Sequence, residues 1–415
     1  MFAVPNGYTA CVVLVLCSWL FSWSRQWLQR GSTERAGVSI VVSRQRAARV
    51  DTASLKVSRL LSWTIDSVAK EAPILAAAWS MSVPSDSVPA RFAYYQEERV
   101  LAPVLKQPWN PPKHSWRYSM RTIDFNSSCG PDSRERLLYE GLAEDSSEMH
   151  ADVKPLREVF VEALEHSGVV GNTTGHANVK ANLWLSCAGS GVMTHFDMGH
   201  NLVLQLQGEK TFELLRPSTI PELELPPTGH PYARQCLRES IETDRYISFV
   251  LTPGDALFIP PLWPHRTSAG AALSMGVNIF IDNLEIKIAD ELQKLPLPFE
   301  HEWSTVELHS AVARYLKAFL DAMGTSIKAL QRRWALVETA VKTPEALQCD
   351  VVFPTSREAK IIKYALNSAR LLLDRVTSSE MRYTLALDYC DDVVQSMVGV
   401  FAARAFVVDS ECLRL

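Results

Sequence analysis

The feature that most constrains the fold is a short alternating segment that carries two potential metal ligands. Residues 193–197 read Met-Thr-His-Phe-Asp. On a β-strand, residues two apart point to the same face, so His195 and Asp197 are predicted to present an imidazole and a carboxylate to one point. A further histidine, His265, follows a second apolar strand and the proline-rich corner 260–264. Two histidines and one carboxylate form a facial set that can hold Fe(II) with open positions opposite.

Short strands separated by turn residues surround these three residues, which predicts a mainly β jelly-roll barrel, also called a double-stranded β-helix. Gly208-Glu209 predicts a hairpin turn between two of the strands. In the strand before that turn, Leu202, Leu204 and Leu206 alternate with more polar residues. The expected strands cover residues 182–186, 193–197, 201–207, 210–215, 246–251, 256–259 and 273–281.

Lys210 follows this turn and shares its strand face with Phe212 and Leu214. Those two residues are natural interior residues, so Lys210 is predicted to point inward as well. A buried ammonium needs a partner, and a dicarboxylate ligand would supply one. The alternative is that Lys210 extends to solvent from the start of the strand. His200 has the opposite parity to His195, which favours a place in a loop or at the mouth of a substrate site.

Four segments of the chain together resemble the JmjC/cupin-like Fe(II) and 2-oxoglutarate-dependent dioxygenases: residues 194–197, 201–210, 253–265 and 276–280. The resemblance implies that His195, Asp197 and His265 ligate iron and that Lys210 binds the distal carboxylate of 2-oxoglutarate. It further implies that Asn201, Asn278 and Thr194 lie beside the cosubstrate and the metal. Residues 137–145 resemble a family segment whose tyrosine approaches the cosubstrate, which makes Tyr139 another candidate.

Within that family, the motifs are most similar to the hydroxylases of the wybutosine base in tRNA, and they are also similar to the asparaginyl hydroxylases of proteins. The resemblance thus implies an oxidoreductase that uses Fe(II), 2-oxoglutarate and O₂ on a tRNA base or on a protein side chain. The net charge of −4 and the pI near 6.2 argue against a surface that coats nucleic acid, although a local basic pocket is compatible with them. A non-catalytic, membrane-tethered cupin-like binding protein is the alternative from a different class.

Residues 1–50 are expected to be a leader that stands apart from the fold. Its apolar run, residues 8–23, is shorter than the about 20 residues that a membrane-spanning helix needs. Arginines then accumulate up to Val50, with Glu34 as the one acid between residues 24 and 50. Three interpretations stay open: a membrane anchor with the catalytic part in the cytosol, a mitochondrial presequence, and a start-site artefact.

The remaining chain divides into a predicted cupin-like catalytic domain, 51–284, and a predicted helical domain, 285–415. The helical domain is expected either to pack on the barrel or to form a homodimer. Eight cysteines without a Cys-x-x-Cys pair favour a reducing compartment, with neither a zinc site nor a disulfide framework. Further expected elements are one or two helices within 58–79, a strand at 121–125, and helices at 153–164, 288–295, 306–323, 327–341, 356–375 and 379–404.

Overall fold

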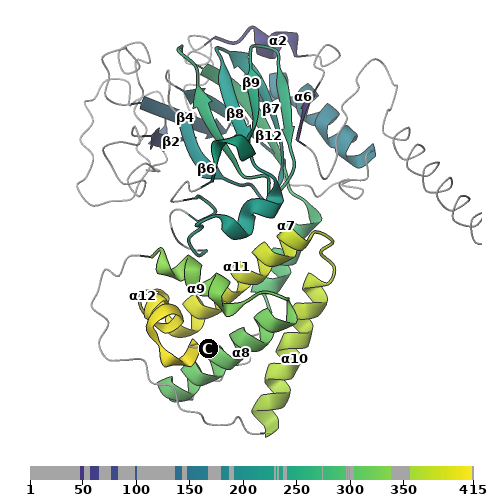
Figure 1. The fold of residues 1–415 in the computed structure, drawn as a ribbon. Coiled ribbons are helices and arrows are strands. Elements are labelled where there is room, and N and C mark those ends of the chain that lie inside the picture. The colour runs from purple at the N-terminus through teal and green to yellow at the C-terminus, as the bar shows by residue number, and fades with distance from the viewer. Residues whose placement is uncertain are drawn as a thin grey trace, which may run out of the picture.

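The computed structural model shows a β-rich part and a helical part joined through a common core (Figure 1). It describes residues 47–50, 57–64, 76–82, 99–100, 136–142, 147–166, 179–186, 191–337 and 356–413, apart from gaps at 229, 231–232, 237–240, 273, 296, 298 and 300–302. The apolar run 8–23 and the predicted strand 121–125 lie outside the described residues. Among the described helices, none is long and apolar enough to cross a membrane.

The described strands form two sheets, and every pair of neighbouring strands is antiparallel. The larger sheet has the order β1-β10-β7-β12-β5-β4-β2-β3, and the smaller sheet has the order β6-β11-β8-β9. Between β6 and β12 the chain passes repeatedly from one sheet to the other, which confirms the predicted double-stranded β-helix. The strands are β1 (Ala48–Val50), β2 (Ala76–Ser82), β3 (Arg99–Val100), β4 (Arg136–Leu142), β5 (Val179–Ser186), β6 (Gly191–His195), β7 (His200–Gln207), β8 (Lys210–Leu214), β9 (Ile247–Leu251), β10 (Ala256–Ile259), β11 (His265–Ala269) and β12 (Ser274–Ile281).

The predicted hairpin at Gly208-Glu209 is wrong. β7 pairs with β10 and β12, whereas β8 pairs with β11 and β9 in the other sheet. Gly208 has a φ of 65°, a left-handed conformation that glycine adopts without strain, and it turns the chain from one sheet into the other. Alternating residues around a glycine look the same whether the two strands pair with each other or with distant strands.

Helices cover the outer face of the larger sheet. The predicted helix at 153–164 is confirmed as part of α6 (Ser147–His166), where Phe160 meets Phe258 of β10 edge-on with ring centroids 6.0 Å apart. Within 58–79, the described residues form the short helix α2 (Ser58–Leu61) and the start of β2, so the helical expectation is wrong for residues 76–79. β2 pairs with β4 from Ala77 to Ser82, so sheet extension outweighs the local helical pattern there.

The C-terminal part is helical, as expected. Ser304 and Glu307 form a reciprocal capping box that starts α8. The single helix expected over 379–404 is wrong, because Gly399 has a φ of 87° and separates α11 from α12. The helices are α7 (Leu284–Gln293), α8 (Thr305–Ala322), α9 (Ile327–Ala335), α10 (Ser356–Leu373), α11 (Ser379–Val398) and α12 (Val400–Arg404).

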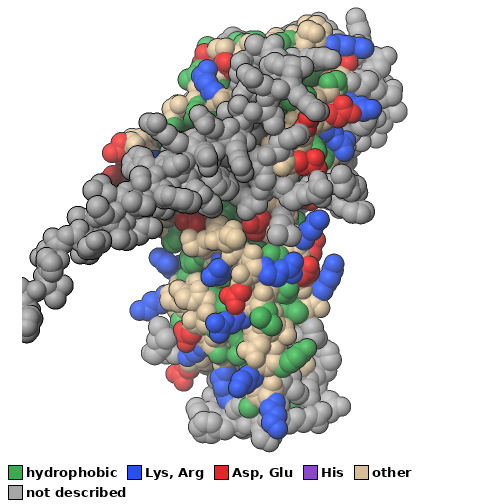
Figure 2. Space-filling model, turned by 90° about the vertical axis from the view of Figure 1, so that its right-hand side faces the viewer, with side chains coloured by type: hydrophobic (Ala, Val, Ile, Leu, Met, Phe, Trp, Pro, Cys, Tyr) green, Lys and Arg blue, Asp and Glu red, His purple; other side chains and the backbone are tan. Residues whose placement is uncertain are grey.

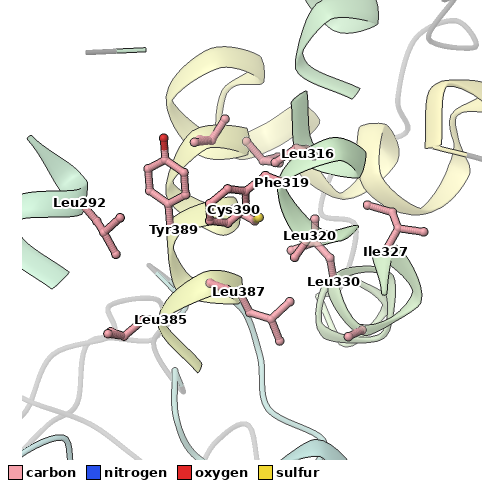
Figure 3. Close-up of a cluster of buried hydrophobic side chains, with 14 of the residues drawn as sticks. Leu292, Leu316, Phe319, Leu320, Ile327, Leu330, Leu385, Leu387, Tyr389 and Cys390 are labelled. Atoms are coloured by element: carbon pink, nitrogen blue, oxygen red, sulfur yellow. The ribbon is translucent and has the colours of Figure 1, made fainter. Parts of the chain in front are cut away.

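One apolar core joins the helices to the barrel. Leu316 and Phe319 of α8 pack with Leu387 of α11 inside the helical part (Figure 3). The same cluster continues to Phe196 and Leu262 beside the predicted metal ligands. The helical region is therefore packed on the barrel, and the homodimer stays a prediction. On the face shown in Figure 2, basic and acidic side chains are interspersed over the helical part.

The described cysteines are not all reduced. Cys236 and Cys390 are buried free thiols. Cys412, however, is disulfide-bonded. The sequence spacing contained no signal for this bond, because disulfide pairing depends on the distance between Cα atoms in the fold rather than on separation along the chain.

Candidate metal centre

The structure brings the three predicted metal ligands together. His195 ends β6 and His265 begins β11, and the two residues are directly paired across these strands. Asp197 lies just beyond the end of β6, in the turn that leads to β7. Potential ligand atoms of all three residues lie within 4.8 Å of one another. The ring centroids of His195 and His265 are 4.3 Å apart, so one ion could contact all three side chains.

The hydrogen bond between His265 and the Trp263 carbonyl determines which ring nitrogen of His265 carries no proton. That nitrogen, Nε2, is the one that faces Asp197. Its Nδ1 lies 2.9 Å from the carbonyl oxygen of Trp263, which can only accept, so Nδ1 carries the proton. Burial and the neighbouring His195 lower the pKa of His265 to about 4. The ring is therefore neutral at pH 7, and its Nε2 lone pair lies 3.8 Å from Oδ2 of Asp197. Nε2 and Oδ2 therefore face each other with lone pairs and no proton between them, an arrangement in which both atoms can ligate a cation.

Two strained residues support the turn that carries Asp197. Among the described residues, Arg234 and Leu262 are the non-glycine residues with positive φ, at 66° and 62°. The carbonyl of Arg234 accepts a hydrogen bond from the Phe196 amide at 3.3 Å, and the Leu262 amide donates to the Asp197 carbonyl at 2.9 Å. Such conformations cost about 1–3 kcal/mol each and persist only where the surroundings enforce them. The ligand turn is thus held rigidly from both sides.

A cavity of about 320 Å³ adjoins the three ligands, between the two sheets. Lys210 lines it and is 6% exposed, so its side chain points inward rather than to solvent. Its Nζ lies 5.2 Å from the ring centroid of Trp184, close enough for a cation–π interaction. The cavity therefore has a metal-ligand end and a cationic end.

Asn201 and Asn278 form a relay of hydrogen bonds that ends on Asp197. The indole nitrogen of Trp184 donates to Oδ1 of Asn278 at 3.0 Å, and Nδ2 of Asn278 donates to Oδ1 of Asn201 at 3.1 Å. Nδ2 of Asn201 lies 3.4 Å from Oδ2 of Asp197. Because the indole can only donate, it orients the whole relay toward the carboxylate. Both asparagines were predicted beside the metal, whereas Trp184 was not predicted as a site residue.

Two further buried polar side chains line the cavity and were also missed. The Thr267 hydroxyl has no hydrogen-bond partner among the described residues. Nε2 of Gln205 donates to the Gln207 carbonyl and to Ser274 Oγ, both at 2.8 Å. Oε1 of Gln205 has no hydrogen-bond partner in the part of the chain that the structure describes. Buried polar atoms are rarely unsatisfied, so their presence indicates a ligand or water in the cavity. Strand parity could have found Thr267, which is two residues from His265.

The structure gives the strand positions of three further residues that the sequence singled out. The hydroxyl groups of Thr194 and Tyr246 are 3.1 Å apart, and Thr194 is not among the residues that line the cavity. Tyr139 lies on β4 opposite Leu185, and its side chain falls outside the described part of the chain. The expected place of His200 in a loop is wrong, and its place at the mouth of a substrate site stays a prediction. His200 begins β7, stacks on Phe258 with ring centroids 6.0 Å apart, and lines a different hollow, beside the start of α11.

Residues 125–285 match the family model of the cupin-like domain. The chain contains a cupin-like domain. This match confirms the JmjC/cupin-like resemblance, and it spans the described strands β4 to β12, with all three residues of the predicted metal site.

Several curated proteins are similar to part of this chain. A tRNA wybutosine-synthesizing protein 4 from Aspergillus oryzae is 36% identical over 95 residues, which are 22% of this chain and 9% of that protein. A tRNA wybutosine-synthesizing protein 5 from Danio rerio is 31% identical over 165 residues, or 38% of this chain and 48% of that protein. The chain thus spans less than half the length of these relatives.

The ribosomal oxygenase YcfD from Escherichia coli, in complex with cobalt and 2-oxoglutarate, shares 13% sequence identity with this chain at a TM-score of 0.38. That comparison covers 78% of this chain and 63% of YcfD. Another structure of E. coli YcfD shares 16% identity at a TM-score of 0.36.

Proposed function

We propose that this chain is an Fe(II)- and 2-oxoglutarate-dependent dioxygenase that hydroxylates a macromolecular substrate. The observation that carries the proposal is one cavity with two chemically distinct ends. His195, Asp197 and His265 converge at one end, and the buried ammonium of Lys210 lies at the other. A neutral histidine opposite a carboxylate suits a divalent ion, and a single cation suits the free carboxylate of a chelating oxo-acid.

Strand register supports this division of roles. His265, Thr267 and Ala269 lie on one face of β11, and Ala269 is paired with Lys210. The hydroxyl of Thr267, which has no hydrogen-bond partner among the described side chains and backbone groups, therefore lies between the metal ligands and Lys210 along the cavity wall. A dicarboxylate that binds at both ends passes this hydroxyl, which donates to it. Lys210 neutralises the distal carboxylate, and a hydrogen bond to a charged group contributes about 1.5–3 kcal/mol.

The chain's own residues supply the geometry for the reaction. When bound, Fe(II) and 2-oxoglutarate together activate O₂ for oxidation of a substrate C–H bond, with release of succinate and CO₂. The three ligands leave open coordination positions toward the cavity. The relay through Asn278 and Asn201 keeps the carboxylate of Asp197 oriented. Phe212 and Val203 give the cavity an apolar wall that limits the entry of water.

A tRNA base is the substrate that we propose first, because relatives from Aspergillus oryzae and Danio rerio carry names of tRNA wybutosine synthesis. A protein side chain is the second candidate. The net charge of −4 favours it, since a protein that binds RNA tightly usually offers a concentrated basic surface. On the face shown in Figure 2, Lys and Arg alternate with Asp and Glu instead.

The test is release of succinate from 2-oxoglutarate by the full chain, purified anaerobically and supplied with Fe(II), ascorbate and O₂. We expect turnover that is absent in His195→Ala. Stimulation by total tRNA, abolished by ribonuclease, supports the base hydroxylase. Stimulation by a protein fraction that resists ribonuclease supports the side-chain hydroxylase. Absence of both Fe(II) binding and succinate release would contradict the enzyme and favour a non-catalytic cupin-like binding protein.

A further inference from the structure

One connection in the chain touches both the metal-ligand strand and the C-terminal helices. It lies between the 3₁₀ turns at Pro217–Glu222 and Thr243–Arg245. We call its described residues 226–228 and 233–236 the strap. The first piece lies against the helices, and the second lies against the end of β6 and lines the cavity through residues 233–235.

The strap covers the free edge of the strand that carries His195. β6 is the edge strand of the smaller sheet, and among the described strands it pairs with β11 alone. On its other side, the Cys236 amide donates to the Thr194 carbonyl at 2.7 Å, and the Phe196 amide donates to the Arg234 carbonyl at 3.3 Å. Gln235 forms an antiparallel bridge directly to His195. The strap thus acts as a short additional strand at the metal ligands.

At its other end, the strap is bound to the C-terminal helices by Thr228, whose amide, hydroxyl and carbonyl groups all form hydrogen bonds. The Thr228 amide donates to Oδ2 of Asp391 at 3.1 Å, and the Thr228 hydroxyl donates to Oδ1 of Asp392 at 3.0 Å. Nε2 of Gln395 donates to the Thr228 carbonyl at 2.6 Å. All three partners lie on α11, so a single helix fixes this residue. Nη2 of Arg333 also lies 3.4 Å from the Pro226 carbonyl.

The part of α11 that binds the strap belongs to a buried ionic cluster, which restricts its movement. Arg333 of α9 lies 2.9 Å from Asp388 and 3.0 Å from Asp391, and Asp391 is fully buried. The indole nitrogen of Trp334 donates to the second oxygen of Asp391 at 2.8 Å. Removing one member would leave an uncompensated buried charge, so the cluster has little freedom to rearrange.

We propose that the C-terminal helices position the metal ligands through the strap, with Asp391, Asp392 and Gln395 as positioning residues. This inference rests on the proposed metal site at His195, Asp197 and His265. The helical region is then a part of the metal centre rather than an appended module. Arg234 joins both sides, because its carbonyl holds Phe196 while its guanidinium lies 3.8 Å from Asp388.

The test uses Co(II) as a spectroscopic probe of the site in the full chain. Gln395→Met and Thr228→Val each remove strap contacts and leave the buried ion cluster intact. We expect each variant to bind Co(II) about tenfold more weakly than the wild type, as loss of partners behind metal ligands typically does. We also expect the visible ligand-field bands of the bound Co(II) to shift, which a general loss of stability would not cause.

Two matched controls separate positioning from folding. Thr228→Ser keeps the hydroxyl group and is expected to retain the affinity and spectrum of the wild type. Tyr389 lies on α11, the helix that binds the strap, and Tyr389→Phe removes its buried hydrogen bond of 2.7 Å to Tyr315 of α8. Tyr389 does not line the cavity and makes none of the strap hydrogen bonds described above. The substitution is expected to lower thermal stability without changing Co(II) affinity or spectrum.

The outcomes distinguish the two proposals. Wild-type affinity and spectrum in both Gln395→Met and Thr228→Val would overturn the positioning role while the metal site stands. Absence of a Co(II) site in the wild type, or a site unaffected by His195→Ala, would instead overturn the metal centre and with it the proposed function.

Discussion

Nε2 of His265 lies 3.8 Å from Oδ2 of Asp197, while Nδ1 of the same ring is occupied by the Trp263 carbonyl. The tautomer that this carbonyl imposes leaves two acceptors facing each other at the end of a cavity. No proton is available to bridge them at pH 7, because burial lowers the pKa of His265 to about 4. The pair is therefore arranged for a metal ion before any ion arrives, which reduces the rearrangement that binding requires.

Lys210→Met is expected to raise the KM for 2-oxoglutarate by about 10- to 100-fold, the equivalent of one lost charged hydrogen bond. Metal affinity should not decrease, because Lys210 lies opposite Ala269, four residues along β11 from His265, and an ammonium group cannot ligate a cation. Steady-state succinate release and a Co(II) titration measure the two quantities. Lys287→Met on the exposed face of α7 is the control for loss of one positive charge. Equal effects of the two substitutions would contradict the assigned role.

Thr267→Val is expected to leave the stability of the ligand-free protein unchanged or raised, because the deleted hydroxyl has no hydrogen-bond partner among the described residues. The KM for 2-oxoglutarate should nevertheless rise by about tenfold if the hydroxyl donates to the cosubstrate. Thr267→Ser should keep the wild-type KM. Urea unfolding and succinate release together measure the contrast, and a stability loss without a KM change would place the hydroxyl in the scaffold.

Gly191→Ala should separate the two strands that carry the histidine ligands. A Cβ at Gly191 would lie 2.2 Å from the backbone carbonyl oxygen of Thr267, so β6 and β11 would have to move apart. We expect a loss of at least about 2 kcal/mol in the free energy of unfolding, as for other overpacked sites. Gly270→Ala is the control, because its Cβ would lie 3.2 Å from the Cβ of Glu209, a milder contact than the one at Gly191. Urea denaturation should show a clearly smaller loss for this variant.

His309 makes the helical part sensitive to acid. Burial on α8 lowers the pKa of His309 below its ordinary value of 6.5. As the pH falls through 6.5, the unfolded chain takes up a proton that the folded chain does not, so stability decreases by up to about 1.4 kcal/mol per pH unit. His309→Gln should remove this contribution. Urea unfolding between pH 7.5 and 5.5 should give a flatter pH dependence for the variant, and identical slopes would contradict the prediction.

Strand parity was sufficient to group most of the site. Lys210 and Phe212 share a face through the two-residue period of β8. The same period predicted His195 beside Asp197, although β6 ends at His195 and Asp197 lies in the following turn. Strand parity also places Thr267 on the same face of β11 as His265, although Thr267 was not predicted as a site residue. It failed at Gly208-Glu209, because two consecutive strands in a double-stranded β-helix need not pair with each other.

The sequence by itself determined the candidates: local periodicity indicated the inward face of Lys210 and the amphipathic helices, and the motif resemblance indicated His195, Asp197 and His265 as one ligand set. Only the tertiary structure decided how these elements meet. It placed β7 and β8 in different sheets, left β6 at an edge, and brought Thr228 to α11 so that the strap completes that edge. Such pairings join residues far apart along the chain, and their energy depends on shape and burial that no local pattern encodes.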